Sequence, residues 1–113
     1  MSKLSEEQLD LIFSALSDRT RRSILKKVQV QECSVKDLVE NYDMSFQAVA
    51  KHLNVLEKAH LINKRKSGRH YYSSLNEKQL TQALNWISKQ YDFWNSSFSS
   101  LDEFLNAQDD DTK

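Results

Sequence analysis

The chain has no proline, one glycine and one cysteine among its 113 residues. A single cysteine cannot form a disulfide within the chain, so we expect a reducing compartment. No apolar run approaches the length of a membrane span, and the polar, acidic start MSKLSEEQLD is unlike a secretory signal. These absences favour one soluble domain in the cytoplasm, with no membrane partner.

The formal net charge is also zero, but the charges are distributed unevenly along the chain. Residues 1–18 carry a net charge of −3, residues 19–42 carry +3, residues 43–72 carry +4 and residues 73–113 carry −4. A basic middle between acidic ends creates a local field that the whole-chain total hides. The neutral total therefore does not exclude a polyanionic partner.

Without proline or glycine, helix boundaries must be inferred from capping residues. Four capping sites predict four helices: Ser5 with Gln8 as a capping box, Ser17 or Asp18, Ser34, and Ser45. The third and fourth helices are joined only by NYDM, which predicts a helix-turn-helix. The apolar residues expected inside are Leu9, Ile12, Phe13 and Leu16 in the first helix, Ile24, Leu25 and Val28 in the second, Leu38 in the third, and Val49, Leu53 and Leu56 with Phe46 beside them in the fourth.

The opposite face of the fourth helix, SFQAVAKHLNVL, is polar but has no acid. It carries Gln47, Lys51 and Asn54 at helical spacing. Amide side chains can donate and accept in pairs to base edges in a major groove, and a lysine suits a phosphate or a guanine. Ala48 could meet a thymine methyl, and the backbone N–H groups at Ser45 could bind a phosphate. A solvated helix face is the alternative, and this segment alone does not decide between them.

The segment LINKRKSGRHYYSSL changes to a strand pattern around the only glycine. Ser67-Gly68 is a turn signal and predicts a β-hairpin, so the whole arrangement is a winged helix. Five cations crowd the hairpin with no acid among them: Lys64, Arg65, Lys66, Arg69 and His70. Their repulsion predicts a polyanion nearby. Tyr72 could bind a phosphate or simply pack under the wing.

The helical period returns from Asn76 onward. A heptad stripe consists of Leu80, Leu84, Ile87, Tyr91, Trp94, Phe98, Leu101 and Leu105. A second stripe of Trp86, Phe93 and Phe104 lies about 100° to one side, which is too wide an apolar arc for one partner. We expect one domain over residues 1–107, with a dimerisation helix over about 76–107 that pairs together with the first helix. Residues 108–113 should be a disordered tail, and a break near Ser97 is the alternative to one continuous helix.

Three arginines, Arg19, Arg21 and Arg22, occupy the first turn of the second expected helix, where the helix dipole disfavours cations. Asp18 can offset part of this by pairing with Arg22. A DNA phosphate and internal pairing with other acids are both open as further reasons for the arrangement.

No catalytic or metal-binding constellation is present. His52, His60 and His70 fall on three different elements without ligand spacing. Cys33 stands alone at a helix start, where the dipole could lower its pKa, and a buried inert thiol is the alternative. The sequence therefore predicts no enzyme and no cofactor.

Together these segments resemble the ArsR/SmtB-type winged helix-turn-helix regulators over about residues 9–105. ALSDRTRRSIL is similar to the opening signature of that family, MSFQAVAKHLNVLEKAHLI to its recognition helix, and KSGRHYYSSL to its wing. The resemblance implies a homodimer that binds operator DNA as a repressor. It places the DNA-contacting stretch at Ser45, Phe46, Gln47, Ala50, Lys51 and His52.

Several residues depart from the family pattern. Phe46 occupies a usual glutamine position and Ala50 a frequent serine, so the base preference does not transfer. His60 replaces a usual glycine at a helix end that calls for a left-handed backbone. Ser34 and Lys36 stand where metal-sensing members have Cys-x-Cys. The resemblance thus implies a branch without metal-sensing sites.

The sequence predicts a mainly α winged helix-turn-helix regulator with a two-stranded β wing and a long C-terminal dimerisation helix. The residues expected to contact double-stranded DNA are Ser45, Phe46, Gln47, Ala48, Ala50, Lys51, His52, Asn54, Lys64, Arg65, Lys66, Arg69, His70 and Tyr72. The heptad stripe is the expected dimer interface. Two alternatives stay open, a metal- or thiol-responsive sensor repressor and a protein-interaction module that does not bind DNA.

Overall fold

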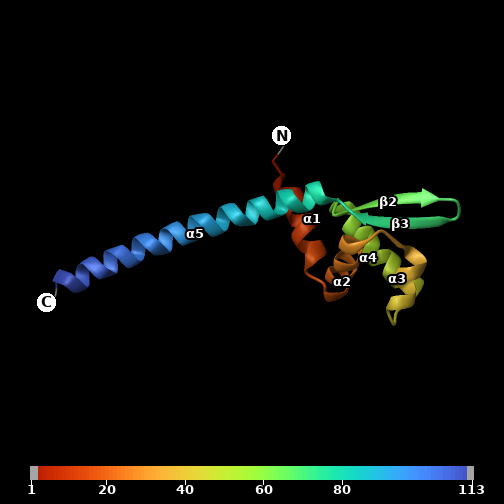
Figure 1. Cartoon of the computed structure of the whole chain (residues 1–113), viewed down its shortest axis with the longest axis horizontal. Coiled ribbons are helices and arrows are strands. Elements are labelled where there is room, and N and C mark those ends of the chain that lie inside the picture. The colour runs from red at the N-terminus through yellow and green to blue at the C-terminus, as the bar shows by residue number, and fades with distance from the viewer. Residues whose placement is uncertain (1–2, 112–113) are drawn as a thin grey trace. The chain divides into compact units, whose positions relative to one another are not determined.

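A computed structural model describes the backbone of residues 3–111 and the side chains of residues 3–107. The chain divides into two compact units, Met1–Ala83 and Leu84–Lys113. The elements in chain order are α1 (Glu6–Leu16), α2 (Arg19–Val30), β1 (Cys33–Ser34), α3 (Val35–Asn41), α4 (Phe46–Lys58), β2 (Ile62–Ser67), β3 (His70–Leu75) and α5 (Glu77–Asp111) (Figure 1). The mainly helical winged helix-turn-helix predicted from the sequence is confirmed.

The expected capping residues begin the helices of the first unit. Ser5 accepts a hydrogen bond from the Gln8 amide at 3.1 Å, and the Gln8 side chain accepts one from the Ser5 amide at 2.8 Å. Asp18, not Ser17, caps α2. Ser34 and Ser45 cap α3 and α4 in the same way. Each side chain satisfies an amide that the helix itself leaves without an acceptor.

The core of the first unit contains the apolar faces of all four helices. Ile12, Ile24, Leu38 and Leu56 have no exposed surface. Phe13 and Phe46, which the sequence pattern placed with the inner residues of the first and fourth helices, are exposed instead.

Phe13 is 38% exposed and Phe46 56%. The buried face of α1 is formed by Leu9, Ile12 and Ala15, which leaves Phe13 at its edge. Phe46 is the first residue of α4, one turn before the point at which that helix enters the core at Val49.

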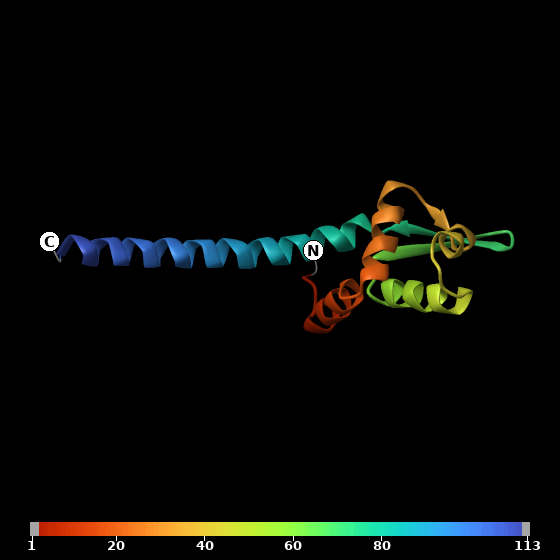
Figure 2. The same cartoon turned by 90° about the horizontal axis from the view of Figure 1, so that it is seen from below.

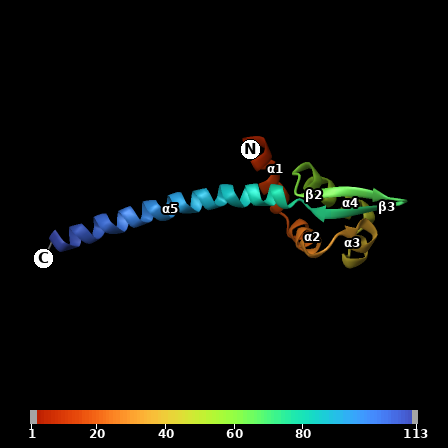
Figure 3. The same cartoon turned by 45° about the horizontal axis from the view of Figure 1, so that its top comes forward.

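A hairpin of β2 and β3 forms the wing, with registers from Ile62 opposite Leu75 to Ser67 opposite His70 (Figures 1 and 3). The turn is therefore Gly68 and Arg69, one residue later than expected. Gly68 has a φ of +62°, which a residue without Cβ adopts at little cost. The sheet also has a third strand, β1, paired to β3 in the order β1-β3-β2. Its two residues are too few to show a period in the sequence.

The end of α4 confirms the left-handed backbone expected at His60, whose φ is 59°. The His60 amide donates to the Glu57 carbonyl at 2.9 Å, and the Leu61 amide donates to the Leu56 carbonyl at 3.0 Å. This pair of bonds is a Schellman motif, and the fully buried Leu56 and Leu61 supply its apolar contact. The motif turns the chain directly from α4 into the wing.

The start of α5 is attached to the core of the first unit. Asn76 caps it by accepting from the Gln79 amide at 3.4 Å, and the Gln79 side chain donates to the Ala59 carbonyl at 3.0 Å. Ala83 is buried, and Leu80 packs partly against the core.

From Leu84 onward every described side chain of α5 is exposed. Figure 2 shows α5 as one uninterrupted helix. It passes Ser97 without a break and continues to Asp111, beyond the expected start of a tail at residue 108, because neither proline nor glycine interrupts it. Residues 112–113 of that expected tail lie outside the described residues. No helix in the described part of the chain has both the length and the apolar character to cross a membrane.

Candidate nucleic-acid interface

The outer face of α4 is formed by Gln47, Lys51 and Asn54, all exposed, on the side away from the buried residues of this helix. The Ser45 hydroxyl accepts from the Ala48 amide at 3.1 Å. By the geometry of a helix start, the amides of the first two residues have no acceptor within the helix. The beginning of α4 therefore offers N–H donors beside an amide side chain and a cation.

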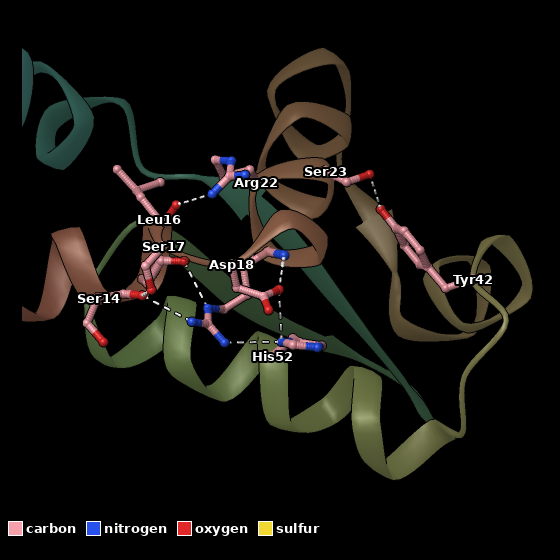
Figure 4. Close-up of polar contacts among 10 residues, drawn as sticks. Ser14, Leu16, Ser17, Asp18, Arg22, Ser23, Tyr42 and His52 are labelled. Atoms are coloured by element: carbon pink, nitrogen blue, oxygen red, sulfur yellow. Dashed lines mark hydrogen bonds and ion pairs between the residues drawn. The ribbon is translucent and has the colours of Figure 1, made fainter.

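His52 is half-buried and directed toward the junction of α1 and α2 (Figure 4). Its Nδ1 lies 3.3 Å from Nη1 of Arg21 and 3.8 Å from a carboxylate oxygen of Asp18. The hydrogen bond from the Arg21 amide is the largest cause that holds the pKa of Asp18 below its usual value, and the charges of His52 and Arg21 add to it. His52 thus connects α4 to the junction of α1 and α2.

The arginines at the start of α2 stabilise the end of α1. Arg21 donates through Nε to the Ala15 carbonyl at 2.8 Å and through Nη2 to the Ser14 carbonyl at 3.0 Å. Arg22 donates to the Leu16 carbonyl at 2.8 Å, as Figure 4 shows, and does not pair with Asp18 as expected. Free carbonyls and the negative end of the helix dipole attract both guanidinium groups. The positive charges of Arg21 and Arg22 are unfavourable at the start of α2 but stabilise the end of α1.

The cations of β2 have partners within the protein. Arg65 donates to both carboxylate oxygens of Glu32, at 2.6 and 3.2 Å, and its guanidinium lies 4.8 Å from the centre of the Tyr72 ring. Lys64 lies 3.9 Å from a carboxylate oxygen of Glu57 and 4.5 Å from the centre of the Tyr71 ring. The inference that only a polyanion offsets the repulsion of the wing cations was therefore wrong.

Lys66 also lies near the Tyr71 ring, at 5.8 Å from its centre. The hydrogen bond from Arg65 lowers the pKa of Glu32 and so favours its charged form. Within the described residues, the side chains of Arg69 and His70 at the wing tip have no hydrogen bond or ion pair, and Lys66 has only its ring contact. Arg69 and Lys66 are therefore the wing cations without an anionic partner.

One groove brings part of the predicted helix set and part of the predicted wing set together. Phe46, Ala50 and Asn54 of α4 line it with Lys64, Arg69 and His70 of the wing. Gln47 and Lys51 lie outside the groove on the exposed face of α4. Tyr72 is half-buried under Arg65 and opposite Ser34 of β1, so it packs under the wing.

Sequence reasoning missed Glu32, Glu57 and Tyr71 as partners of the wing cations. Glu32 and Arg65 are 33 residues apart, and no local spacing relates them. Their contact depends on β1, which brings the end of α2 beside the wing. For Tyr71 the only signal in the sequence was an aromatic residue in a basic hairpin. The strand register places it opposite Lys66.

The residues at the metal-sensing positions do not fit a metal. The Ser34 hydroxyl is nearly buried and accepts from the Asp37 amide at 3.1 Å, and Lys36 is a cation. In the portion of the chain that is described, no three His, Cys, Asp or Glu side chains gather as ligands. Burial, with the nearby charge of Asp37, raises the pKa of the Cys33 thiol, which favours the inert thiol over one whose pKa the helix dipole lowers.

Comparisons with known proteins agree on one family. The family described as "Bacterial regulatory protein, arsR family" matches residues 18–64. The transcriptional repressor SdpR of Bacillus subtilis (strain 168) is 34% identical over 76 residues, which cover 67% of this chain and 84% of that protein. The uncharacterized HTH-type transcriptional regulator YuzN of the same strain is 38% identical over 87 residues, with 69% and 94% covered. The solved structure of an ArsR-like transcriptional regulator from Rhodococcus sp. RHA1 is similar with a TM-score of 0.77 at 28% identity, and the match covers 87% of this chain and 92% of that one.

Proposed function

This chain belongs to the arsR family of bacterial transcriptional regulators, and from that premise we propose that it is a homodimeric repressor, active in the cytoplasm, that binds a palindromic operator in double-stranded DNA without a metal or other cofactor. Repression is proposed because SdpR, a similar protein, is a transcriptional repressor. Independence from metal is proposed because Ser34 and Lys36 replace the ligands that metal-sensing members carry.

The observation that carries the proposal is the exposed, acid-free face of α4. Gln47 and Asn54 can donate and accept at base edges in the major groove, and Lys51 can reach a phosphate or a guanine. An α-helix fits that groove, and the N–H groups at the start of α4 suit a backbone phosphate. Ala48 and Ala50, both half-buried, would offer methyl groups beside the polar contacts.

The wing adds a second, weaker contact in this proposal. Arg69 and His70 at its tip are free to approach phosphates. Lys64, Arg65 and Lys66 are held by Glu57, Glu32 and the two tyrosines, so they contribute mainly a positive field. His52 and Tyr72 act by holding α4 and the wing in position.

The homodimer is proposed from the apolar stripe of α5. From Leu84 to Leu105 the heptad residues are between 43% and 67% exposed within one chain. Water contact of so many large apolar side chains is unfavourable, and a second copy of the same stripe would remove it. Leu80 of the expected interface packs on its own core instead. A two-fold dimer reads two half-sites about 34 Å apart, which is one turn of DNA.

The decisive experiment is to sequence the genomic DNA that the purified protein retains, and then to measure affinity for a retained duplex against salt concentration. Lys51→Ala and Arg69→Ala should each reduce the salt slope by about one unit, since each removes a phosphate contact. Lys26→Ala is the matched control, because Lys26 is an exposed cation on α2 that belongs neither to α4 or the wing nor to the groove lining. Binding that ignores salt, or an equal effect of Lys26→Ala, would contradict the proposed interface.

The same experiment separates the proposal from one alternative, and a cysteine variant tests the thiol sensor. Failure to retain any fragment would favour a protein-interaction module. A thiol sensor is disfavoured, because the raised pKa of Cys33 keeps the thiol protonated at neutral pH. Cys33→Ser should therefore bind the retained duplex as the unaltered protein does, before and after mild oxidation.

A further inference from the structure

A groove of about 670 Å³ lies in the first unit, between α3, α4 and the wing. Sites for small organic ligands typically have volumes of about 300–1,000 Å³. This groove has such a size, and the function proposed above assigns it no ligand of its own.

The floor of the groove is apolar and partly aromatic. Val35 and Val39 of α3, Leu53 of α4 and two exposed rings form it. Those rings are Phe46, which is 56% exposed, and Tyr71, which is 41% exposed. Apolar patches enclosed by polar residues on a folded protein commonly mark binding sites. A ligand with a flat or branched apolar body would cover both rings and remove them from water.

The rim of the groove leaves cations without anionic partners. Lys64 already lies 3.9 Å from Glu57, so these two charges offset each other. The side chains of Lys36 and Arg69 have no hydrogen bond or ion pair in the part of the chain that the structure describes, and Glu40 is the remaining acid among the lining residues. One positive charge is therefore in excess among the lining residues, since Lys36, Lys64 and Arg69 outnumber Glu40 and Glu57. This charge balance favours a ligand that carries an acidic group.

We propose that the groove binds an amphipathic organic anion, with an aromatic or branched alkyl body and one acidic group, and that this ligand releases the protein from DNA. The binding of the ligand is argued from the groove itself, and the release from DNA rests on the proposed function. The groove shares six residues with the proposed DNA interface: Phe46, Ala50, Asn54, Lys64, Arg69 and His70. Ligand and duplex would compete for them, so each lowers the affinity of the other.

The probe for this proposal is 8-anilinonaphthalene-1-sulfonate, an aromatic anion that fluoresces in apolar sites. It should bind the full chain, and Ala50→Trp should weaken its binding at least about tenfold by filling the groove. Gln47→Trp is the matched control, because it adds the same ring to an exposed position of α4 outside the groove. Phe46→Ser, at a position that is 56% exposed and outside the core cluster, should also weaken binding.

Methyl NMR then locates the probe, since the exposed residues of α5 offer it another apolar surface. Shifts should appear at Val39 and Leu53 and not at Leu101. The uncharged analogue N-phenyl-1-naphthylamine should bind at least about fivefold more weakly than the sulfonate. Shifts confined to α5, unchanged binding to Ala50→Trp, or equal affinity for the uncharged analogue would overturn the anion site.

Competition with a retained duplex separates this inference from the proposed function. If the protein binds duplex and probe together with no mutual effect, the release mechanism is overturned while the repressor proposal stands. If no duplex binds, the repressor proposal fails, and the titrations of Ala50→Trp and Phe46→Ser still decide whether the groove takes an organic anion. Displacement of the probe by duplex, with loss of duplex at high probe concentration, is the expected result.

Discussion

α4 and the part of α5 that begins at Leu84 are both helices with apolar faces, but only α4 buries its face. Val49 and Leu56 of α4 have no exposed surface, whereas Tyr91 and Phe98 of α5 are 67% and 56% exposed. The same physical pattern therefore has two outcomes in one chain. The apolar face of α4 packs in the core of the first unit, whereas that of α5 is exposed in one chain and is available to the proposed second copy.

The polar side chains of the first unit make many contacts within that unit. In the first unit, arginine side chains bind the carbonyls at the end of α1, and Glu32 and Glu57 bind wing cations. No buried side-chain nitrogen or oxygen of the described residues lacks a hydrogen-bond partner. The buried polar side chains of the first unit thus find their hydrogen-bond partners within one chain. Variants of each region should separate folding of the chain from assembly of two chains.

The largest effect is expected from Leu101→Asp on α5. Leu101 is 50% exposed in one chain, and a charge in its place would have to be buried in the dimer. The dissociation constant of the dimer should rise by about a hundredfold or more, and DNA affinity should fall with it. Sedimentation velocity over a range of concentrations measures the first effect. Ser96→Asp, which adds the same charge on the polar side of α5, should leave the dimer intact; intact dimers of Leu101→Asp would rule out this interface.

Leu56→Ala on α4 should instead destabilise the fold. It removes a fully buried side chain from the core of the first unit, which typically costs about 3 kcal/mol. Urea unfolding should show the same loss at every protein concentration, because this contact lies within one chain. Lys58→Ala, on the exposed side of the same helix, should change the free energy of unfolding by less than about 0.5 kcal/mol. A loss of unfolding free energy for Leu56→Ala that varies with protein concentration would contradict a core formed within one chain.

A smaller effect of opposite sign is expected at His60, where the first unit contains local strain. His60 holds a φ of 59° at the end of α4, a conformation that costs a residue with a Cβ about 1 kcal/mol relative to glycine. His60→Gly should therefore raise the free energy of unfolding by about that amount. His60→Ala keeps the Cβ and is the control, with little gain expected. Equal stabilisation by alanine would show that the histidine ring, not the backbone, is the source of the cost.

The smallest effect is a change in acid stability from Asp18→Asn. The pKa of Asp18 is lowered in the folded state, so its contribution to stability is present above the ordinary value of 3.8 and is lost as the pH falls toward the lowered one. Asparagine also caps helices but does not titrate. The melting temperature of Asp18→Asn should thus fall less steeply than that of the unaltered protein below about pH 4. Parallel profiles would show that the charge of Asp18 adds nothing.

The sequence was sufficient for the features that depend on neighbouring residues. Ser5, Ser34 and Ser45 were identified as helix caps because the chemistry of a helix start lies within four residues. The left-handed backbone at His60 was expected from the family resemblance, in which glycine is usual at that helix end. The contacts of Arg21 and Arg65 were not predictable in this way, because their partners are set by how α1 and β1 lie against later elements.

The exposure of aromatic residues was also beyond local patterns. Phe46 continues the apolar face of α4 in the sequence, yet the core ends at Val49, and only packing of the other helices fixes that limit. The groove lined by Phe46 and Tyr71 is a consequence of that limit together with the position of the wing.

Ser34 belongs to two elements at once, and this has a consequence for the kinetics of association. It pairs with Tyr72 of the wing through β1, and its hydroxyl begins α3 of the helix-turn-helix. The hairpin cannot swing without disturbing the first turn of α3. For the proposed binding to a duplex, this shared residue predicts little loss of chain entropy and no slow rearrangement step.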